Sequence, residues 1–194
     1  MMTLKYFTLA LCLTICTTAF SQKGKNGALT VTAANTRINE FTALTANANV
    51  GNTTITVAAS SLNANGRFSA NLAAGDLVMI IQMQGALIKV KPYNPWEPFV
   101  TDSLYGLIYS YQNCGNYEFA QVKTVISATQ IELECGLTFN YSSAGKTQVV
   151  RVPRYSSLTV NGSGTLTTDA WNGTTGIGGV LVAEVSGNTI IDGV

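Results

Sequence analysis

Apolar and polar residues follow two patterns along this chain, and both are typical of β-strands. Residues 117–126 alternate between two sets of side chains, which predicts a strand with one face inward and one face in water. Residues 77–83 are almost continuously apolar and follow a Gly-Asp turn, which predicts a central strand buried on both faces. The second run is too short for a helix to be the better interpretation.

Shorter runs of the same kind recur between turn residues over most of the chain. They predict further strands at residues 29–32, 54–58, 86–90, 130–133, 148–152, 157–160, 165–167, 180–185 and 189–191. Residues 41–50 are rich in alanine but lack the apolar spacing of a helix, and no helix is predicted after residue 21. The sequence therefore predicts an all-β fold.

The composition along the chain predicts a leader followed by a β-rich domain. Residues 22–40 are small and polar and predict a flexible leader, with an edge strand at 29–32 as the alternative. Residues 41–155 predict a β-sandwich or barrel-like N-terminal domain, in which the proline-rich segment 92–98 forms an irregular surface loop.

From residue 156 onward, short β-runs are separated by Asn-Gly and glycine-rich turns. The spacing from Leu158 to Leu181 suits one coil of a parallel β-helix, or solenoid. One coil cannot bury its own apolar face, so a stable solenoid needs several. Residues 156–194 therefore predict the start of a solenoid, and we expect the chain to be a fragment with further coils beyond Val194.

Residues 1–21 have the order of a secretory signal peptide. Lys5 supplies positive charge, an apolar run covers residues 7–19, and Ala19-Phe20-Ser21 predicts cleavage before Gln22. The apolar run is shorter than the roughly 20 residues that a membrane-spanning helix needs. No second long apolar run follows, so we expect a mature chain that is secreted or held at the outer cell surface without inserting into a membrane.

Composition narrows the classes of function. Charged residues make up 11% of the chain, against about 25% in an ordinary globular protein. Without Lys5 the chain has equal numbers of basic and acidic residues, which argues against binding to nucleic acid. The many Thr, Ser, Asn and Gly residues suit a neutral polar ligand such as a glycan, and they are equally ordinary for an exported solenoid.

The chain contains no histidine. A Ser-His-Asp triad, a Cys-His pair and a histidine-based zinc site are therefore impossible within it. The carboxylates show no local pair of the kind that glycoside hydrolysis uses. Arg151 and Arg154 flank Pro153 and are suited to hold a carboxylate, but we expect them to be surface charges without a specific role. We expect no catalytic residue, no cofactor and no metal site.

Two cysteines remain once the signal peptide is removed. Cys114 and Cys135 are a natural pair in an exported chain, where the compartment permits a disulfide. The sequence predicts a Cys114–Cys135 disulfide, with two separate buried thiols as the alternative.

Aromatic residues concentrate between residues 93 and 117. Rings flanked by Asn, Gln and Asp suit a surface that stacks on sugars, and the candidate ligand-binding residues are Tyr93, Trp96, Tyr105, Tyr109 and Tyr111. The alternative is that these rings cover the open end of a β-sandwich or cap the core of the solenoid, because large rings are usually buried in part.

Five segments carry a pattern larger than single strands: AAGDLVMIIQMQGA (73–86), PYNPW (92–96), NCGNYEFAQV (113–122), AGKTQVVRVPRYSSLTVNGSGTLT (144–167) and DAWNGTTGIGGVLVAEVSGNTIIDG (169–193). Together they resemble the N-terminal region of large secreted surface proteins of Bacteroidetes, over residues 41–194. The resemblance implies an adhesin-like substrate of the type IX secretion machinery, whose longer relatives continue into glycine-rich solenoids. It implies no catalytic residues. It also implies a candidate O-glycosylation site at Ser103, because Asp102-Ser103-Leu104 matches the tripeptide pattern used in that phylum.

These observations lead to one expectation and two alternatives. We expect an exported structural and adhesive module that caps a β-solenoid stalk at the cell surface and catalyses no reaction itself. Its partners would be the export machinery and the glycans or surface of a host or neighbouring cell. The first alternative is a glycan-binding module that uses the aromatic residues of 93–117. The second is the N-terminal part of a β-helix enzyme that degrades polysaccharides, with its catalytic coils beyond Val194.

Overall fold

The computed structural model describes residues 22–89 and 106–192, and these residues form strands and turns without any helix. The strands are β1 (Ala28–Val31), β2 (Thr36–Arg37), β3 (Glu40–Ala43), β4 (Thr54–Thr56), β5 (Leu77–Gln82), β6 (Leu87–Ile88), β7 (Ile108–Ser110), β8 (Tyr117–Ser127), β9 (Gln130–Leu133), β10 (Thr147–Val152), β11 (Arg154–Tyr155), β12 (Ser157–Val160), β13 (Leu166–Thr167), β14 (Glu184–Val185) and β15 (Thr189–Ile191). The predicted all-β class is confirmed. The described part of the chain holds no helix that could span a membrane, and the predicted signal peptide lies outside it.

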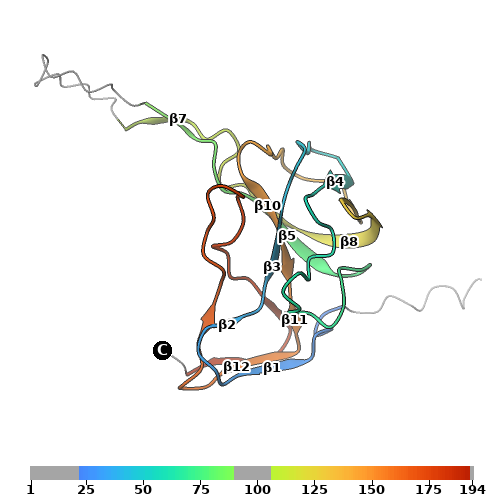
Figure 1. Ribbon diagram of the computed structural model, residues 1–194, viewed down its shortest axis with the longest axis vertical. Coiled ribbons are helices and arrows are strands. Elements are labelled where there is room, and N and C mark those ends of the chain that lie inside the picture. Colours follow the sequence, from blue (N-terminus) through green and yellow to red (C-terminus); the bar gives the residue numbers. More distant parts are fainter. Residues whose placement is uncertain (1–21, 90–105, 193–194) are drawn as a thin grey trace, which may run out of the picture.

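Six strands form one antiparallel sheet in the order β3-β10-β5-β8-β9-β4. The sheet curls until its two edge strands meet, where Leu44 and Val57 form an antiparallel bridge and Thr45 N donates to Thr56 O at 2.9 Å. It occupies the upper half of Figure 1. We call this unit the curled sheet; its half-barrel form agrees with the barrel-like alternative for residues 41–155.

The two central strands of the curled sheet, β5 and β10, are buried on both faces. Val78 and Ile80 point into the interior of the curl, where they join the main core. Met79, between them, points outward and packs with Val150, and Val182 packs against this cluster. The prediction of a central strand at 77–83 is confirmed. The strand is apolar along its length because each of its faces meets a different core.

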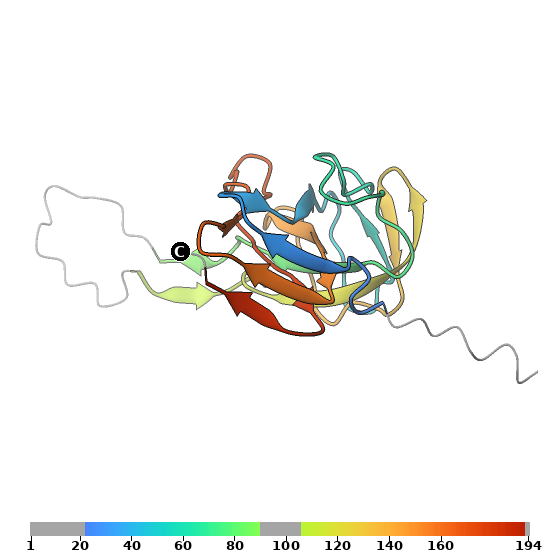
Figure 2. The same cartoon turned by 90° about the horizontal axis from the view of Figure 1, so that it is seen from below.

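A second set of strands pairs in parallel. β1, β12 and β15 form one three-stranded sheet, β2 pairs with β13, and β11 pairs with β14. Figure 2 shows β1, β12 and β15 side by side, with the curled sheet behind them. Leu158 and Val160 of β12 pack with Val31 of β1 in a small core of their own. We call these segments, residues 22–39 and 154–192, the coils.

The repeat in the coils is longer than the predicted one. Arg154 pairs with Glu184 and Leu158 pairs with Thr189, so the turn of the chain that starts at Leu158 ends well beyond Leu181. The extra length lies in residues 169–182. Val180 and Val182 of this stretch cover the outer face of β5 and β10. Leu181, which set the predicted repeat, is 45% exposed and is not the equivalent of the buried Leu158.

The prediction of a flexible leader at residues 22–40 is wrong for most of that segment. β1 pairs with β12 over its whole length, and β2 pairs with β13. We use the name first coil for this parallel-paired segment. β1 lies at the edge of its sheet, as the alternative for 29–32 held. The curled sheet is thus inserted between β2 and β11 along the chain (Figure 1).

The curled sheet does not close the end of the coils by strand pairing. Among the described residues, β1 and β15 pair only with β12, so the outer edge of each strand is open. The curled sheet instead packs against the side of the coils. Two side-chain amides hold residues 169–182 there. The Asn39 amide forms hydrogen bonds with the backbone N–H and C=O of Val182, and the Gln148 amide forms hydrogen bonds of 2.9 Å with the backbone N–H and C=O of Gly178.

Arg151 and Arg154 are buried, contrary to the expectation that they are idle surface charges. Arg151 pairs with Asp76 at 2.7 Å, and Lys25 of the first coil reaches the same carboxylate at 2.6 Å. Arg154 pairs with Glu184 and so links two successive coils. The predicted strand at 148–152 includes Arg151, but the sequence did not reveal that both faces of this strand are covered.

Candidate functional site

The hairpin formed by β6 and β7 projects from the curled sheet as an arm (Figures 1 and 2). Its described residues are 87–89 and 106–111, and we use the term arm for these. Ile88 pairs with Ile108, and Lys89 N donates to Leu107 O at 2.9 Å. The apolar side chains of the arm are exposed by 41% to 49%. A two-stranded hairpin in water buries little of its own surface, so these side chains are available for contact.

Two tyrosines extend this exposed surface toward the base of the arm. Tyr109 is 63% exposed and Tyr111 is 65% exposed. Tyr109 lies within β7, opposite the register shift between Leu87 and Ile88, and Tyr111 directly follows the strand, next to Gln112. A second pair of exposed rings lies at the start of β8, where Tyr117 and Phe119 are in an edge-to-face arrangement with centroids 6.4 Å apart.

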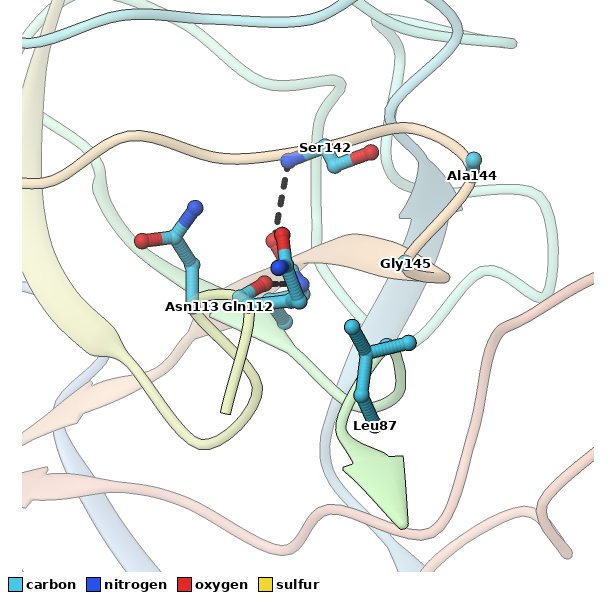
Figure 3. Close-up of a pocket in the computed structure, with 8 residues that line it drawn as sticks. Leu87, Gln112, Asn113, Ser142, Ala144 and Gly145 are labelled. Carbon is cyan, nitrogen blue, oxygen red and sulfur yellow. Dashed lines mark hydrogen bonds between the residues drawn. The ribbon is translucent and has the colours of Figure 1, made fainter. Parts of the chain in front are cut away.

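A hollow of about 440 Å³ lies at the base of the arm. Figure 3 shows Ser142 at the top of the hollow, Asn113 at the left, Leu87 at the bottom, and Ala144 and Gly145 at the right. Its lining is completed by Gln82, Gly85 and Gln112. This volume is in the range of small-molecule sites, and no charged side chain is among the described residues that line it.

Gln82 holds three walls of the hollow together. Its Nε2 donates to the backbone oxygens of Gln84 and Gln112, each at 2.8 Å, and its Oε1 accepts from Ser142 N at 2.9 Å. Gln82 is 1% exposed, so these bonds are sheltered from water. Gly145 allows this arrangement, because a Cβ there would lie 2.4 Å from Gln82 Nε2. The walls of the hollow are therefore set before any ligand arrives.

The wall at residues 111–114 has an unusual backbone. Gln112 and Asn113 are consecutive non-glycine residues with φ of 47° and 66°. The left-handed region is unfavourable for most side chains, and such residues persist only where neighbouring contacts hold them. Here Cys114 N donates to Tyr111 O at 2.8 Å, and Gln82 holds Gln112 O. Backbone of this kind concentrates at functional sites.

Two polar side chains of the lining have no hydrogen-bond partner among the described residues: the amide of Asn113 and the hydroxyl of Ser142. One amide and one hydroxyl supply donors and acceptors for a neutral polar ligand. Leu87 and Ala144 supply apolar surface beside them. The hollow can thus accept a group that is part apolar and part amide or hydroxyl.

The charged groups with shifted pKa values belong to ion pairs outside the lining of the hollow. Burial lowers the pKa of Arg151, against the attraction of Asp76. The hydrogen bond from Arg67 lowers the pKa of Asp169, with a smaller contribution from the charge of Arg37. None of these residues lines the hollow. Within the described residues, no group of three or more Cys, Asp or Glu side chains is placed to hold a metal ion.

The predicted ligand-binding residues are partly described by the structure. Tyr109 and Tyr111 are exposed and lie at or next to the arm, so for these two the alternative of rings buried against a core does not hold. Tyr93, Trp96 and Tyr105 lie outside the described residues, as does Ser103, the candidate site of O-glycosylation.

The predicted disulfide is not formed, because Cys114 and Cys135 are free thiols. Cys135 follows Glu134, whose backbone N donates to Gln121 O in the middle of β8. Cys114 lies in the turn before β8 begins, and its Sγ contacts Met83 O at 3.4 Å. A disulfide needs Cα atoms within about 7 Å, whereas the strand register separates these two positions along β8.

The polar lining of the hollow was missed from the sequence. Gln82 is the one signal that could have revealed it, because it is a polar residue at the end of an otherwise apolar, doubly buried run. A buried polar side chain requires partners, and those partners bring other segments of the chain to it. Ser142 and Gly145 carry no such signal, since they come from a turn 60 residues later in the chain.

No protein-family model and no curated protein matches this chain. Among the solved structures with a distant likeness to it are three bacteriophage tailspikes. The tailspike of Pseudomonas phage phi297 is 15% identical with a TM-score of 0.36, over 69% of this chain and 20% of the tailspike. The tailspike of Acinetobacter baumannii bacteriophage AP22, solved with a capsular saccharide of A. baumannii, is 13% identical with a TM-score of 0.36, over 72% of this chain and 23% of the tailspike.

The tailspike of Pseudomonas phage LKA1 is 13% identical with a TM-score of 0.35, again over 72% of this chain and 23% of the tailspike. The chain thus spans less than a quarter of the length of each tailspike. Likenesses at this level assign neither a family nor an activity to the chain.

Proposed function

We propose that this chain is an exported adhesive module that binds a neutral glycan at its arm and at the hollow beside it. The observation that carries the proposal is the placement of two exposed rings, Tyr109 and Tyr111, next to a hollow without charged lining. Tyrosine presents a flat apolar face and a polar hydroxyl at little loss of side-chain entropy. A sugar ring suits such a surface, because its C–H face is apolar and its rim carries hydroxyls.

We propose a structural role for the rest of the molecule. In this proposal the parallel pairs of β1, β12 and β15, of β2 and β13, and of β11 and β14 are the first turns of a β-solenoid stalk. The common core of Val31, Leu158 and Val160 supports it, because successive coils of a solenoid bury their apolar side chains in one continuous core. The curled sheet braces these turns from the side, through the clamp at Gln148 and the hydrogen bond from Asn39 Nδ2 to Arg151 O.

The proposed location is the outer surface of a bacterial cell. The order of charged, apolar and small residues in 1–21 supports export, and the resemblance to surface proteins of Bacteroidetes supports the type IX route. We propose binding without catalysis. The absence of histidine from the sequence and of charged side chains from the hollow's lining supports this.

A glycan array with the chain that begins at Gln22 tests the proposal. The informative variant replaces both Tyr109 and Tyr111 by Ser, which removes two exposed rings and no core contact. The matched control is Phe119→Ser, which removes an exposed ring from the outer face of β8. We expect saturable binding by the parent chain, loss of at least about tenfold in affinity for the double variant, and little change for the control.

Two results would overturn the binding proposal. One is the absence of binding to every neutral glycan, with the fold intact by circular dichroism. The other is equal loss of affinity in the arm variant and in the Phe119→Ser control. Release of shortened oligosaccharides from the array would contradict the non-catalytic part of the proposal and leave the binding part standing.

A further inference from the structure

The hollow at the base of the arm combines apolar and amide-binding groups within one small space. Leu87 and Ala144 offer apolar surface, while the amide of Asn113 and the hydroxyl of Ser142 have no partner among the described residues. A ligand group that matches this lining carries a small apolar part next to a planar polar part. It also carries no charge, because a carboxylate or ammonium would find no counter-ion in the lining.

The acetamido group of an N-acetylated amino sugar has these properties. Its methyl group is apolar, and its amide has one N–H donor and one C=O acceptor. The side-chain amide of Asn113 can both donate and accept, and so can the hydroxyl of Ser142. From this match, and resting on the glycan-binding function proposed above, we propose that the hollow is a subsite for the acetamido group of an N-acetylhexosamine unit.

The walls are built to hold such a group in one orientation. Gln82 ties Gln112 O and Ser142 N to one buried amide, so the two polar walls keep a constant separation. Asn113 and its neighbour Gln112 are both held in the left-handed conformation. This strained turn fixes the backbone position from which the Asn113 side chain extends. Ordering these groups in advance reduces the entropy lost on binding.

The exposed tyrosines complete the proposed recognition. Tyr111 is the residue directly before Gln112 in the wall of the hollow, and its backbone oxygen closes the turn by accepting from Cys114 N. In the proposal, the acetamido group occupies the hollow while a sugar face packs on the rings of the arm. The rings would accept many sugars, and the hollow would select those with an acetamido group.

The test compares two glycans that differ in this group. Chito-oligosaccharides and cello-oligosaccharides of equal length share their linkage and ring configuration, and differ in an acetamido group against a hydroxyl at one carbon. Binding of both is measured by isothermal titration calorimetry. We expect the parent chain to prefer the chito-oligosaccharide by about tenfold or more.

Two substitutions locate the selectivity within the hollow. Asn113→Gly removes the amide at a position where the backbone already suits glycine, and Ser142→Ala removes the hydroxyl without touching the backbone bond to Gln82. We expect the double variant to lose most of the preference, to within about threefold, with a thermal midpoint near that of the parent chain.

The outcomes separate this inference from the proposed function. Equal affinity for both oligosaccharides, or binding only to glycans without acetamido groups, overturns the inference and leaves the proposed function standing. A preference that survives in the double variant also overturns it, because the selectivity then arises outside the hollow. Binding to no glycan at all overturns both.

Discussion

Arg151 Nη2 donates to Asp76 Oδ2 across 2.7 Å, and both side chains are buried, with exposures of 6% and 9%. The guanidinium also donates to the backbone oxygen of Ala70 at 2.8 Å and lies 4.0 Å from the centre of the Phe68 ring. Lys25 reaches the other carboxylate oxygen of Asp76 at 2.6 Å. One carboxylate thus joins the first coil to the curled sheet.

Removal of this carboxylate should destabilise the fold strongly. Asp76→Ala leaves the guanidinium of Arg151 buried without a counter-ion, so we expect a loss of about 3–5 kcal/mol in the free energy of unfolding. Urea denaturation measures the change. The control is Lys123→Ala, which breaks the exposed pair with Glu132 and should leave stability unchanged within error.

A double replacement separates loss of the pair from loss of packing. In Asp76→Leu with Arg151→Met neither charge of this pair remains buried, so this variant should be more stable than Asp76→Leu alone. If Asp76→Ala changes the unfolding free energy by less than about 1 kcal/mol, the carboxylate does not hold the two parts together.

Packing of the first coil on the second depends on Gly164. A Cβ at this position would lie 2.3 Å from Val31 O, at the end of β1. Gly164→Ala should therefore force β1 away from β12 and destabilise the protein by about 1–3 kcal/mol. Gly162→Ala, two positions earlier, meets only one atom at 3.8 Å and is the matched control.

Hydrogen exchange shows where the Gly164→Ala variant loosens. We expect faster exchange of the amides in β1 and β2 than in the parent chain, with little change in the curled sheet. Uniform loss of protection over both parts would count against a separate coil contact. Unchanged exchange in β1 would show that residues 22–39 are not packed as described.

The state of the two cysteines can be read by thiol titration. We expect two free thiols in the chain without residues 1–21, with Cys135 reacting faster because it is exposed and Cys114 is partly buried. Reaction with a thiol reagent under native and denaturing conditions, followed by intact mass, gives the count and the order. Fewer than two thiols in the unreduced, denatured chain would restore the disulfide predicted from the sequence.

Asp169 should make stability depend on pH in the acid range. Arg67 bonds both of its carboxylate oxygens, at 2.7 and 2.9 Å, and Arg37 lies 3.2 Å away, so its pKa falls below the ordinary 3.8. Because the folded state binds this proton less readily than the unfolded state, the carboxylate stabilises the fold above the ordinary pKa. That contribution is lost as the pH falls through the lowered pKa of the folded state.

The comparison with Asp169→Asn isolates this contribution. The thermal midpoint of the parent should exceed that of the variant by a constant amount from neutral pH down to about pH 5, and the two should converge below about pH 4. The difference should be modest, because the carboxylate is 36% exposed. A difference that grows as the pH falls would contradict the assigned direction of the pKa change.

Most strands of this protein are visible in the local sequence. Predicted runs at 130–133, 157–160 and 189–191 coincide with β9, β12 and β15, and the run at 77–83 contains β5. Alternation with a period of two and punctuation by glycine and asparagine are local properties, so they survive without knowledge of the fold. The exposure of Tyr109 and Tyr111 was one of two alternatives that the sequence left open, and the structure decided it.

The candidate site was predictable only in its aromatic part. The rings at 109 and 111 stand out because aromatic residues are dense there, whereas the hollow is formed by Gln82, Asn113 and Ser142 from three separate turns and strands. The sequence held no pattern that brings these residues together. Their meeting depends on the single buried amide of Gln82, which selects its partners by geometry.

Local patterning therefore sufficed for the class of the fold and the positions of the strands, while strand pairing was decided in three dimensions. β1 pairs with β12 although the whole curled sheet lies between them in the sequence, and Arg151 pairs with Asp76, which is 75 residues away along the chain. Parallel pairing needs no tight hairpin turn and leaves no mark in the adjacent sequence. The coil at 22–39 and the repeat from Leu158 to Thr189 follow from that pairing, because contact across the coils and not local composition sets which backbone groups face each other. The free thiols follow from the antiparallel register of the curled sheet, which separates Cys114 from Cys135 along β8.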